Sequence, residues 1–382
     1  MKTEKLYESD AYLFNFDARI LSSRYNGETV EVILDRTAFF PEGGGQGSDR
    51  GVLGGARVLK VKIAGGEIVH YCDKPPKKGE SVTGEVDMSR RLRMMRCHTG
   101  EHLTSGVIKK LFGFDNVGFN LSDERVTLDC SGPLTGEDIA RLEDEVNARI
   151  REDIPVTAYY PAPEELVKMD YRSKIDLTEG VRIVNIEGVD LCACCAPHVK
   201  STGQIGQIFI DEFLSYKGGT RMYLYCGADA VSRARAYREN LLEIARLFSA
   251  KPFGAVEAVK KSIAQKEELE KTIEALTKEK LQRIADSTPG ESACVITDDL
   301  DQRSCVTLCD MLTASREGLC GVFFKKEGGF GGVIAKKSGG MKAMIPEINS
   351  ELLARGGGTD GMYHGSFGAD EKKIREFFAP RS

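Results

Sequence analysis

Two short clusters of metal-binding side chains, far apart in the sequence, constrain the fold of this chain more than any other feature. The chain has 5 histidines, and three of them lie in these clusters. His98 and His102 are four residues apart, which places both imidazoles on one face of a helix, one turn apart. Cys194 and His198 can add a thiolate and a third imidazole. Because three nitrogens and one sulfur suit tetrahedral Zn²⁺, we expect one zinc ion per chain, bound by these four residues.

The sulfur ligand is less certain than the histidines, because three cysteines lie close together. Cys192 and Cys195 form a C-x2-C pair that could belong to a different site, and two of the three cysteines could be ordinary thiols. Residues 98–102 also read H-x-x-E-H, the inverted zinc-protease motif, in which Glu101 would be the general base. That interpretation leaves the Cys194 and His198 motif unexplained.

Length, composition and charge exclude several classes of protein. A chain of 382 residues, 41% hydrophobic and 29% charged, is ordinary for a globular protein of two or three domains. The sequence lacks the run of about 18 apolar residues that a membrane span requires. The 11 cysteines without a secretory signal indicate a reducing, cytoplasmic environment. A net charge of −5 argues against RNA binding by the whole surface but allows a local basic patch.

Hydrophobic periodicity and capping residues predict an α+β protein. Apolar and charged residues alternate over residues 30–35, which predicts a strand, and Ala64-Gly65-Gly66 predicts a hairpin turn. A helix should begin near Asp87 or Ser89 and stop at Gly113. Thr135 and Asp138 predict a capping box at the start of another helix.

The change of pattern along the chain predicts four regions. Two long helical stretches, residues 230–248 and 256–284, have near-heptad apolar spacing and a hinge at residues 251–254. Glycine clusters alternate with short apolar strands after residue 288. We expect a barrel-like β-rich domain, a zinc-containing α+β domain, an antiparallel helical hairpin, and a glycine-rich α/β domain, with boundaries at 1–88, 89–228, 229–288 and 289–382.

Four motifs in order resemble the editing domain of alanyl-tRNA synthetase. They are the glycine-rich stretch Leu34–Gln46 with Asp49 and Gly51, the zinc helix motif His98–Leu103, the segment Cys194–Gly203, and the strand Lys217–Gly227. The helical region and the glycine-rich end, including residues 356–358 and 365–369, resemble the C-terminal domain of the same synthetase, which it shares with DHH phosphoesterases. The resemblance therefore covers nearly the whole chain.

The departures from the synthetase pattern are also informative. The family's Cys-Gly-Gly-Thr-His is Cys194-Cys195-Ala196-Pro197-His198 here, and the tyrosine that follows phenylalanine is Phe40. The aminoacylation and tRNA-recognition domains have no counterpart before Tyr12. The resemblance thus implies a free-standing alanyl-tRNA editing protein of the long type, with the C-terminal domain attached for tRNA binding and homodimerisation.

The reaction that the resemblance implies is hydrolysis of the ester between a wrong amino acid and tRNA(Ala), chiefly seryl-tRNA(Ala), with glycyl-tRNA(Ala) as a second candidate. Apolar pockets discriminate poorly between similar side chains, so hydrolytic proofreading is needed. Thr37 and Gln46 are candidates for recognising the seryl hydroxyl, although each could have a purely local role. Glu101 is a candidate base, although an exposed helical glutamate is the commoner case.

RNA should be bound by the glycine run and by arginines on the zinc helix. Gly43, Gly44 and Gly45 would allow close approach of the terminal nucleotide, or simply a tight turn. Arg93 and Arg96 could bind phosphates, or lie on a solvated helix face. A DHH phosphoesterase would need adjacent histidines, which the sequence lacks. A non-catalytic, zinc-stabilised RNA-binding module is the remaining alternative.

Overall fold

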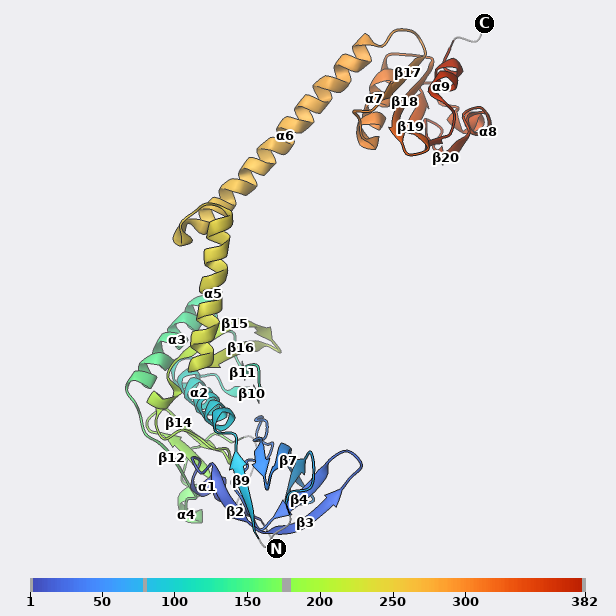
Figure 1. Cartoon of the computed structure of the whole chain (residues 1–382). Coiled ribbons are helices and arrows are strands. Elements are labelled where there is room, and N and C mark those ends of the chain that lie inside the picture. Colours follow the sequence, from blue (N-terminus) through green and yellow to red (C-terminus); the bar gives the residue numbers. More distant parts are fainter. Residues whose placement is uncertain (1–2, 78–80, 174–179, 380–382) are drawn as a thin grey trace. The chain divides into compact units, whose positions relative to one another are not determined.

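The computed structural model describes residues 3–77, 81–173 and 180–379 (Figure 1). The chain forms two compact units, residues 1–242 and 243–382. Helices and strands alternate in both units, which confirms the α+β class. Within the described residues, no helix is both long and apolar enough to cross a membrane. The four domain boundaries expected from the sequence stay predictions.

The first unit begins with a seven-stranded antiparallel sheet, in the order β2-β9-β6-β7-β8-β4-β3. Valine and leucine at alternate positions of β4 are buried, as the period-two pattern predicts. Gly65 and Gly66 have φ of +59° and +82°, so they form the tight turn expected of this hairpin. The strands are β2 (Asn15–Ala18), β3 (Ile20–Tyr25), β4 (Val30–Leu34), β6 (Gly51–Leu53), β7 (Ala56–Ala64), β8 (Glu67–Cys72) and β9 (Val82–Val86).

Helix α2 (Met88–Phe112) follows this sheet and carries the first histidine cluster. Its start is capped by the Asp87 side chain, which accepts a hydrogen bond from Arg90 N at 3.0 Å. Its end is Gly113, whose φ of +74° is left-handed. Both ends are as the sequence predicted. Residues 97–108 are buried without interruption, so α2 is a core helix rather than a surface helix.

Two further sheets and a capped helix complete the first unit around α2. Helix α3 (Gly136–Arg151) has the predicted capping box between Thr135 and Asp138. Its apolar face and that of the four-stranded sheet β10-β11-β16-β15 share a hydrophobic core with α2. The remaining elements are β1 (Glu4–Lys5), α1 (Leu6–Ser9), β5 (Arg36–Thr37), β10 (Asn116–Leu121), β11 (Val126–Cys130), β12 (Val156–Tyr159), α4 (Pro163–Leu166), β13 (Ile183–Ile186), β14 (Asp190–Ala193), β15 (Ile208–Tyr216) and β16 (Gly219–Cys226).

The second unit is a five-stranded sheet, in the order β17-β18-β19-β21-β20, with helices that pack on it. The predicted helices are present as α5 (Ala228–Leu247), most of which belongs to the first unit, and α6 (Ala255–Ser287) in the second, whereas their pairing as a hairpin stays a prediction. The other elements are β17 (Ala293–Thr297), α7 (Gln302–Ala314), β18 (Leu319–Lys326), β19 (Gly329–Lys336), α8 (Met341–Glu351), β20 (Ala354–Gly358), β21 (Met362–Phe367) and α9 (Glu371–Phe377).

A buried ion pair joins α2 to the glycine-rich segment of the first sheet. Arg91 is fully buried, and its Nε lies 3.0 Å from Asp49 Oδ2. The same Asp49 oxygen accepts a hydrogen bond from Phe40 N at 2.6 Å. Arg91 Nη1 also donates to the carbonyl of Ala11 at 2.9 Å. Arg91 is therefore part of the core, and it fixes the segment that carries the glycine run against the helix.

We predict that Arg91→Met destabilises the protein by about 3–5 kcal/mol, because it leaves Asp49 as a buried carboxylate without its counter-ion. The matched control is Arg57→Met, which breaks the exposed pair with Asp73 and should cost less than about 1 kcal/mol. Urea unfolding of both variants, followed by circular dichroism, makes the comparison. Equal losses in the two variants would contradict this view of the core.

Candidate metal centre

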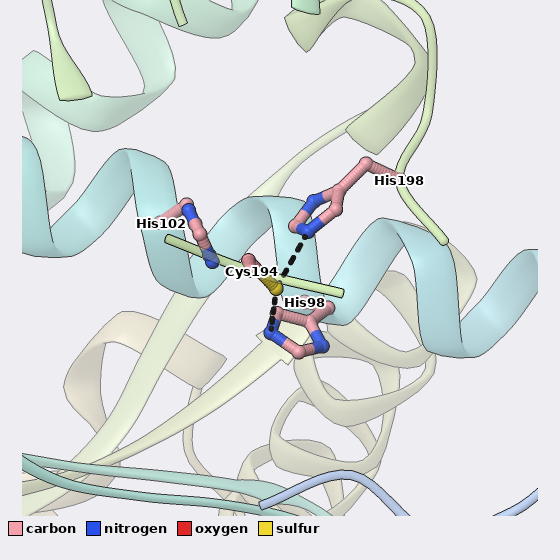
Figure 2. Close-up of side chains that lie close together, drawn as sticks. All are labelled: His98, His102, Cys194 and His198. Atoms are coloured by element: carbon pink, nitrogen blue, oxygen red, sulfur yellow. Dashed lines mark hydrogen bonds between the residues drawn. The ribbon is translucent and has the colours of Figure 1, made fainter. Parts of the chain in front are cut away.

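The two clusters of metal-binding side chains meet inside the first unit. His98 and His102 project from α2, and Cys194 and His198 come from the loop after β14 (Figure 2). Cys194 Sγ lies 3.6 Å from His98 Nε2 and 3.4 Å from His198 Nε2. One potential ligand atom from each of the four residues lies within 4.8 Å of the others. All three histidines are buried.

The loop that carries Cys194 and His198 is fixed by hydrogen bonds on both sides. Arg182 Nη1 donates to the carbonyls of Cys194 and Ala196, at 3.1 and 3.0 Å. The amide of Val199 donates to Thr99 Oγ1 at 3.2 Å, which ties the end of the loop to α2. The loop therefore presents its two ligands to the helix in a defined arrangement.

Each histidine Nδ1 lies close to an oxygen atom of another side chain, which leaves Nε2 for the centre. His98 Nδ1 lies 2.6 Å from Gln46 Oε1, and His198 Nδ1 lies 3.0 Å from Thr99 Oγ1. His102 Nδ1 lies 3.0 Å from Asp190 Oδ2. Metal-ligating histidines commonly contact such an outer partner, which orients the ring. Gln46, predicted as a substrate-recognition residue, is thus placed to orient a ligand.

The electrostatics of the cluster favour a thiolate beside imidazoles. Burial alone would raise the pKa of Cys194, but His98 and His198 outweigh it and hold that pKa well below its ordinary value. Burial lowers the pKa of His198 to about 3, so that ring is neutral. Burial also opposes the charged form of His102, yet Asp190 and Cys194 raise its pKa well above the ordinary value.

These donors fit a zinc ion, since a thiolate and three imidazole Nε2 atoms match its preferred tetrahedral ligands. The neighbouring cysteines fit less well. Burial raises the pKa of Cys192 to about 11, and this thiol groups with Asp190 and His102 rather than with the four ligands. Cys195 is exposed and lies in neither group.

A cavity of about 320 Å³ opens beside the cluster. Its wall includes His98, His102 and Cys194, together with the predicted site residues Gly43, Gly44 and Glu101. Gly43 and Gln46 exchange backbone hydrogen bonds of 3.1 and 3.0 Å, so the glycine run is a tight turn at the edge of this cavity. Gly45 has no room for a side chain, because a Cβ atom there would lie 2.6 Å from the carbonyl oxygen of Phe119.

Glu101 is buried, not exposed, and several side chains fix its carboxylate. Ser105 Oγ donates to Glu101 Oε1 at 2.6 Å, and Asn116 Nδ2 donates to the same oxygen. Arg172 Nη1 lies 3.6 Å from Oε1. The other oxygen, Oε2, lies 3.9 Å from His102 Nε2, so this carboxylate lies in the cavity wall beside the histidine cluster.

Of the predicted site residues, six do not line this cavity: Thr37, Gly45, Gln46, Arg93, Arg96 and His198. Thr37 lies in β5, which pairs with β1 outside the seven-stranded sheet, and is fully buried; its Oγ1 lies 2.8 Å from His70 Nε2. Arg93 is paired with Asp229 at 2.5 Å, and Arg96 Nε donates to the carbonyl of Gln204 at 3.1 Å. The cations in the cavity wall are instead Lys5, Arg172 and Arg182, which no local motif in the sequence pointed to.

The chain is similar to known proteins of tRNA aminoacylation and editing. Residues 181–223 match the family model described as threonyl and alanyl tRNA synthetase second additional domain, and residues 5–90 match tRNA synthetases class II (A). The chain is 35% identical over 286 residues to alanyl-tRNA editing protein AlaX-L of Pyrococcus horikoshii, covering 72% of this chain and 71% of that protein. This chain belongs to the alanyl-tRNA editing protein family.

Alanine–tRNA ligases are also related to this editing protein. The chain is 33% identical over 290 residues to the ligase of Ignicoccus hospitalis, covering 72% of the chain and 30% of the ligase. For the ligase of Pyrobaculum neutrophilum, the identity is 31% over 291 residues, covering 71% of the chain and 32% of the ligase. The match thus spans about a third of each ligase.

We predict one tightly bound zinc ion per chain. Cys194→Ala should lose most of the metal, because it removes the sulfur nearest to the histidines. Cys195→Ala and Cys192→Ala should keep it, since neither thiol belongs to the four-residue cluster. Metal analysis of the three purified variants, side by side, makes the test. Loss of zinc from Cys195→Ala with retention in Cys194→Ala would show that the ligand assignment is wrong.

Proposed function

We propose that this editing protein hydrolyses the aminoacyl ester of mischarged tRNA(Ala), chiefly seryl-tRNA(Ala), with glycyl-tRNA(Ala) as a second substrate. The observation that carries the proposal is the shared wall of the cavity, in which a buried carboxylate, Glu101, lies beside the Cys/His cluster. The relationship to AlaX-L and to the ligases supports the substrate class.

In this proposal, Glu101 acts on water at the ester carbonyl. Its Oε2 is the carboxylate oxygen nearer to the cluster, while Ser105 and Asn116 hold Oε1. Glu101 accepts a proton from water as the new C–O bond forms, and the proton passes to the ribose oxygen as the ester C–O bond breaks. A zinc ion bound by all four of His98, His102, Cys194 and His198 would have a filled tetrahedral shell, so it would polarise an ester oxygen or water only where one of these ligands gives way, and would otherwise position the substrate.

The rest of the cavity suits an aminoacyl nucleotide end. The turn at Gly43 and Gly44 lets the backbone come close to the ribose and its phosphate. Lys5 and Arg182 lie in the same wall, where they can offset the phosphate charge. We assign Gln46 to orientation of His98. We leave Thr37 without a catalytic role, because its buried hydroxyl contacts His70 and it does not line the cavity.

The alternative functions are weaker. A protease of the H-x-x-E-H type would not use Cys194, yet this thiol lies nearest to two of the histidines. A non-catalytic RNA-binding module would gain nothing from a buried carboxylate in the cavity wall, because burying a charge is costly. Both alternatives are also less consistent with the relationship to AlaX-L.

We predict that Glu101→Gln lowers kcat for deacylation of seryl-tRNA(Ala) by about 10²–10⁴-fold, because it removes the proton acceptor and keeps the shape of the side chain. The control is Glu137→Gln in the first turn of α3, which is exposed and should stay within about twofold of the wild type. Single-turnover deacylation of seryl-tRNA(Ala) and alanyl-tRNA(Ala) is the assay. A wild-type protein that binds seryl-tRNA(Ala) without hydrolysing it would overturn the proposed reaction.

We also propose that the protein is a homodimer through its second unit. On α6, Ile263, Leu269, Ile273 and Leu276 are each more than half exposed. Their near-heptad spacing suits packing against the same helix of a second copy. The double variant Ile263→Glu with Ile273→Glu should sediment as a monomer, whereas the wild type should sediment as a dimer. A wild-type monomer at micromolar concentration would exclude this arrangement.

A further inference from the structure

One arginine of the cavity wall joins two buried carboxylates that contact the histidine cluster. Arg172 Nε and Nη2 bind the two oxygens of Asp190, at 3.2 and 2.9 Å. Its third nitrogen, Nη1, lies 3.6 Å from Glu101 Oε1. Two-point binding of a carboxylate by a guanidinium fixes the plane of both groups, which a lysine could not do.

Each carboxylate lies near a different ring nitrogen of His102. Asp190 Oδ2 lies 3.0 Å from His102 Nδ1, and Glu101 Oε2 lies 3.9 Å from His102 Nε2. Both carboxylates are almost completely buried, whereas the Arg172 side chain is 22% exposed. Without Arg172, two neighbouring negative charges would share one imidazole, an arrangement that strongly favours movement of one carboxylate out of the site.

The position of Arg172 is set by its backbone. Its amide donates to the carbonyl of Leu191 at 2.8 Å, and its carbonyl accepts from the amide of Ala193 at 2.9 Å. Arg172 therefore lies alongside β14, the strand that contains Asp190 and leads directly to Cys194. Strand β14 and its pairing with Arg172 therefore fix the positions of three groups: the Arg172 guanidinium, the outer partner Asp190 and the ligand Cys194.

We propose that Arg172 is a positioning residue that serves both halves of the site: it holds Asp190 against His102 and holds Glu101 in the cavity wall. The part of this inference that concerns Glu101 rests on the proposed function. The part that concerns zinc binding through Asp190 and His102 does not depend on that function. Arg172 does not itself contact the four-ligand cluster, so its effect passes through the two carboxylates.

The test uses Arg172→Gln and Arg172→Lys in the full-length protein, with two readouts. The first is zinc affinity, measured by competition with a chelator, and the second is kcat and KM for seryl-tRNA(Ala) with zinc in excess. Arg172→Gln should weaken zinc binding about 10–100-fold, as the loss of an outer partner does. It should also lower kcat at least about tenfold at saturating zinc, with KM within about threefold, because Glu101 is no longer held.

The conservative variant and a matched control separate positioning from folding. Arg172→Lys should recover part of each loss, since an ammonium group can reach one carboxylate but cannot bind it at two points. The control is Arg221→Gln, which removes an equally close two-point pair with Asp129, at 2.7 Å, from residues that do not line the cavity. It should leave both readouts unchanged.

Wild-type zinc affinity or wild-type kcat in Arg172→Gln would overturn the proposal, as would equal losses in Arg221→Gln. If Arg172→Gln fails to fold, full zinc affinity and full kcat in Arg172→Lys would overturn it too. If the wild-type protein does not deacylate seryl-tRNA(Ala), the proposed function fails, and zinc affinity alone then decides whether Arg172 holds the metal-binding half.

Discussion

The first unit depends on one constraint: side chains of a buried helix must meet side chains of a loop that comes much later in the chain. Cys194 and His198 reach His98 and His102 only if β14 ends beside the middle of α2. The contacts at the histidine Nδ1 atoms connect further parts of the unit to the cluster. Gln46 belongs to the turn that contains the glycine run, and Asp190 belongs to β14. The site is therefore the point at which three segments of the unit are joined.

Burial of so many polar groups is stable because nearly all of them have partners. Helix α2 is buried from Cys97 to Ile108, a stretch that includes Glu101 and both of its histidines. The carboxylate of Glu101 has Ser105, Asn116 and Arg172 around it. A buried charge is costly when it is alone and tolerable when it is bonded on every side. Helix α2 can therefore hold polar and charged side chains inside a hydrophobic core.

Local rules predicted much of this structure from the sequence. The caps of α2 and α3, the turn at Gly65 and Gly66, and the strand alternation depend on residues a few positions apart, and all were predicted. The histidine cluster was predictable for a similar reason, since a spacing of four residues defines a helix face. Cys194 was the expected sulfur ligand, but the sequence left Cys192 and Cys195 as alternatives, because the choice depends on which thiol the loop turns inward.

The charged residues show where sequence reasoning stops. Arg93 and Arg96 were expected to bind RNA, yet Arg93 is paired with Asp229 and Arg96 donates to the carbonyl of Gln204. Their neighbour Arg91 is a core residue paired with Asp49. The arginines that reach the cavity, Arg172 and Arg182, stand in stretches without a recognisable motif. Their roles come from contacts between distant segments, which no local pattern encodes. Glu101 stays a candidate base, as the sequence indicated, but its burial comes from the tertiary fold.

X-ray absorption at the zinc edge of the full-length protein tests this account most directly. The account predicts three nitrogen neighbours at about 2.0–2.1 Å and one sulfur neighbour at about 2.3 Å. The sulfur contribution should disappear in Cys194→Ala and persist in Cys195→Ala, because Cys194 is the thiol that faces the histidines. A zinc shell without sulfur in the wild type, or one that keeps its sulfur in Cys194→Ala, would contradict it.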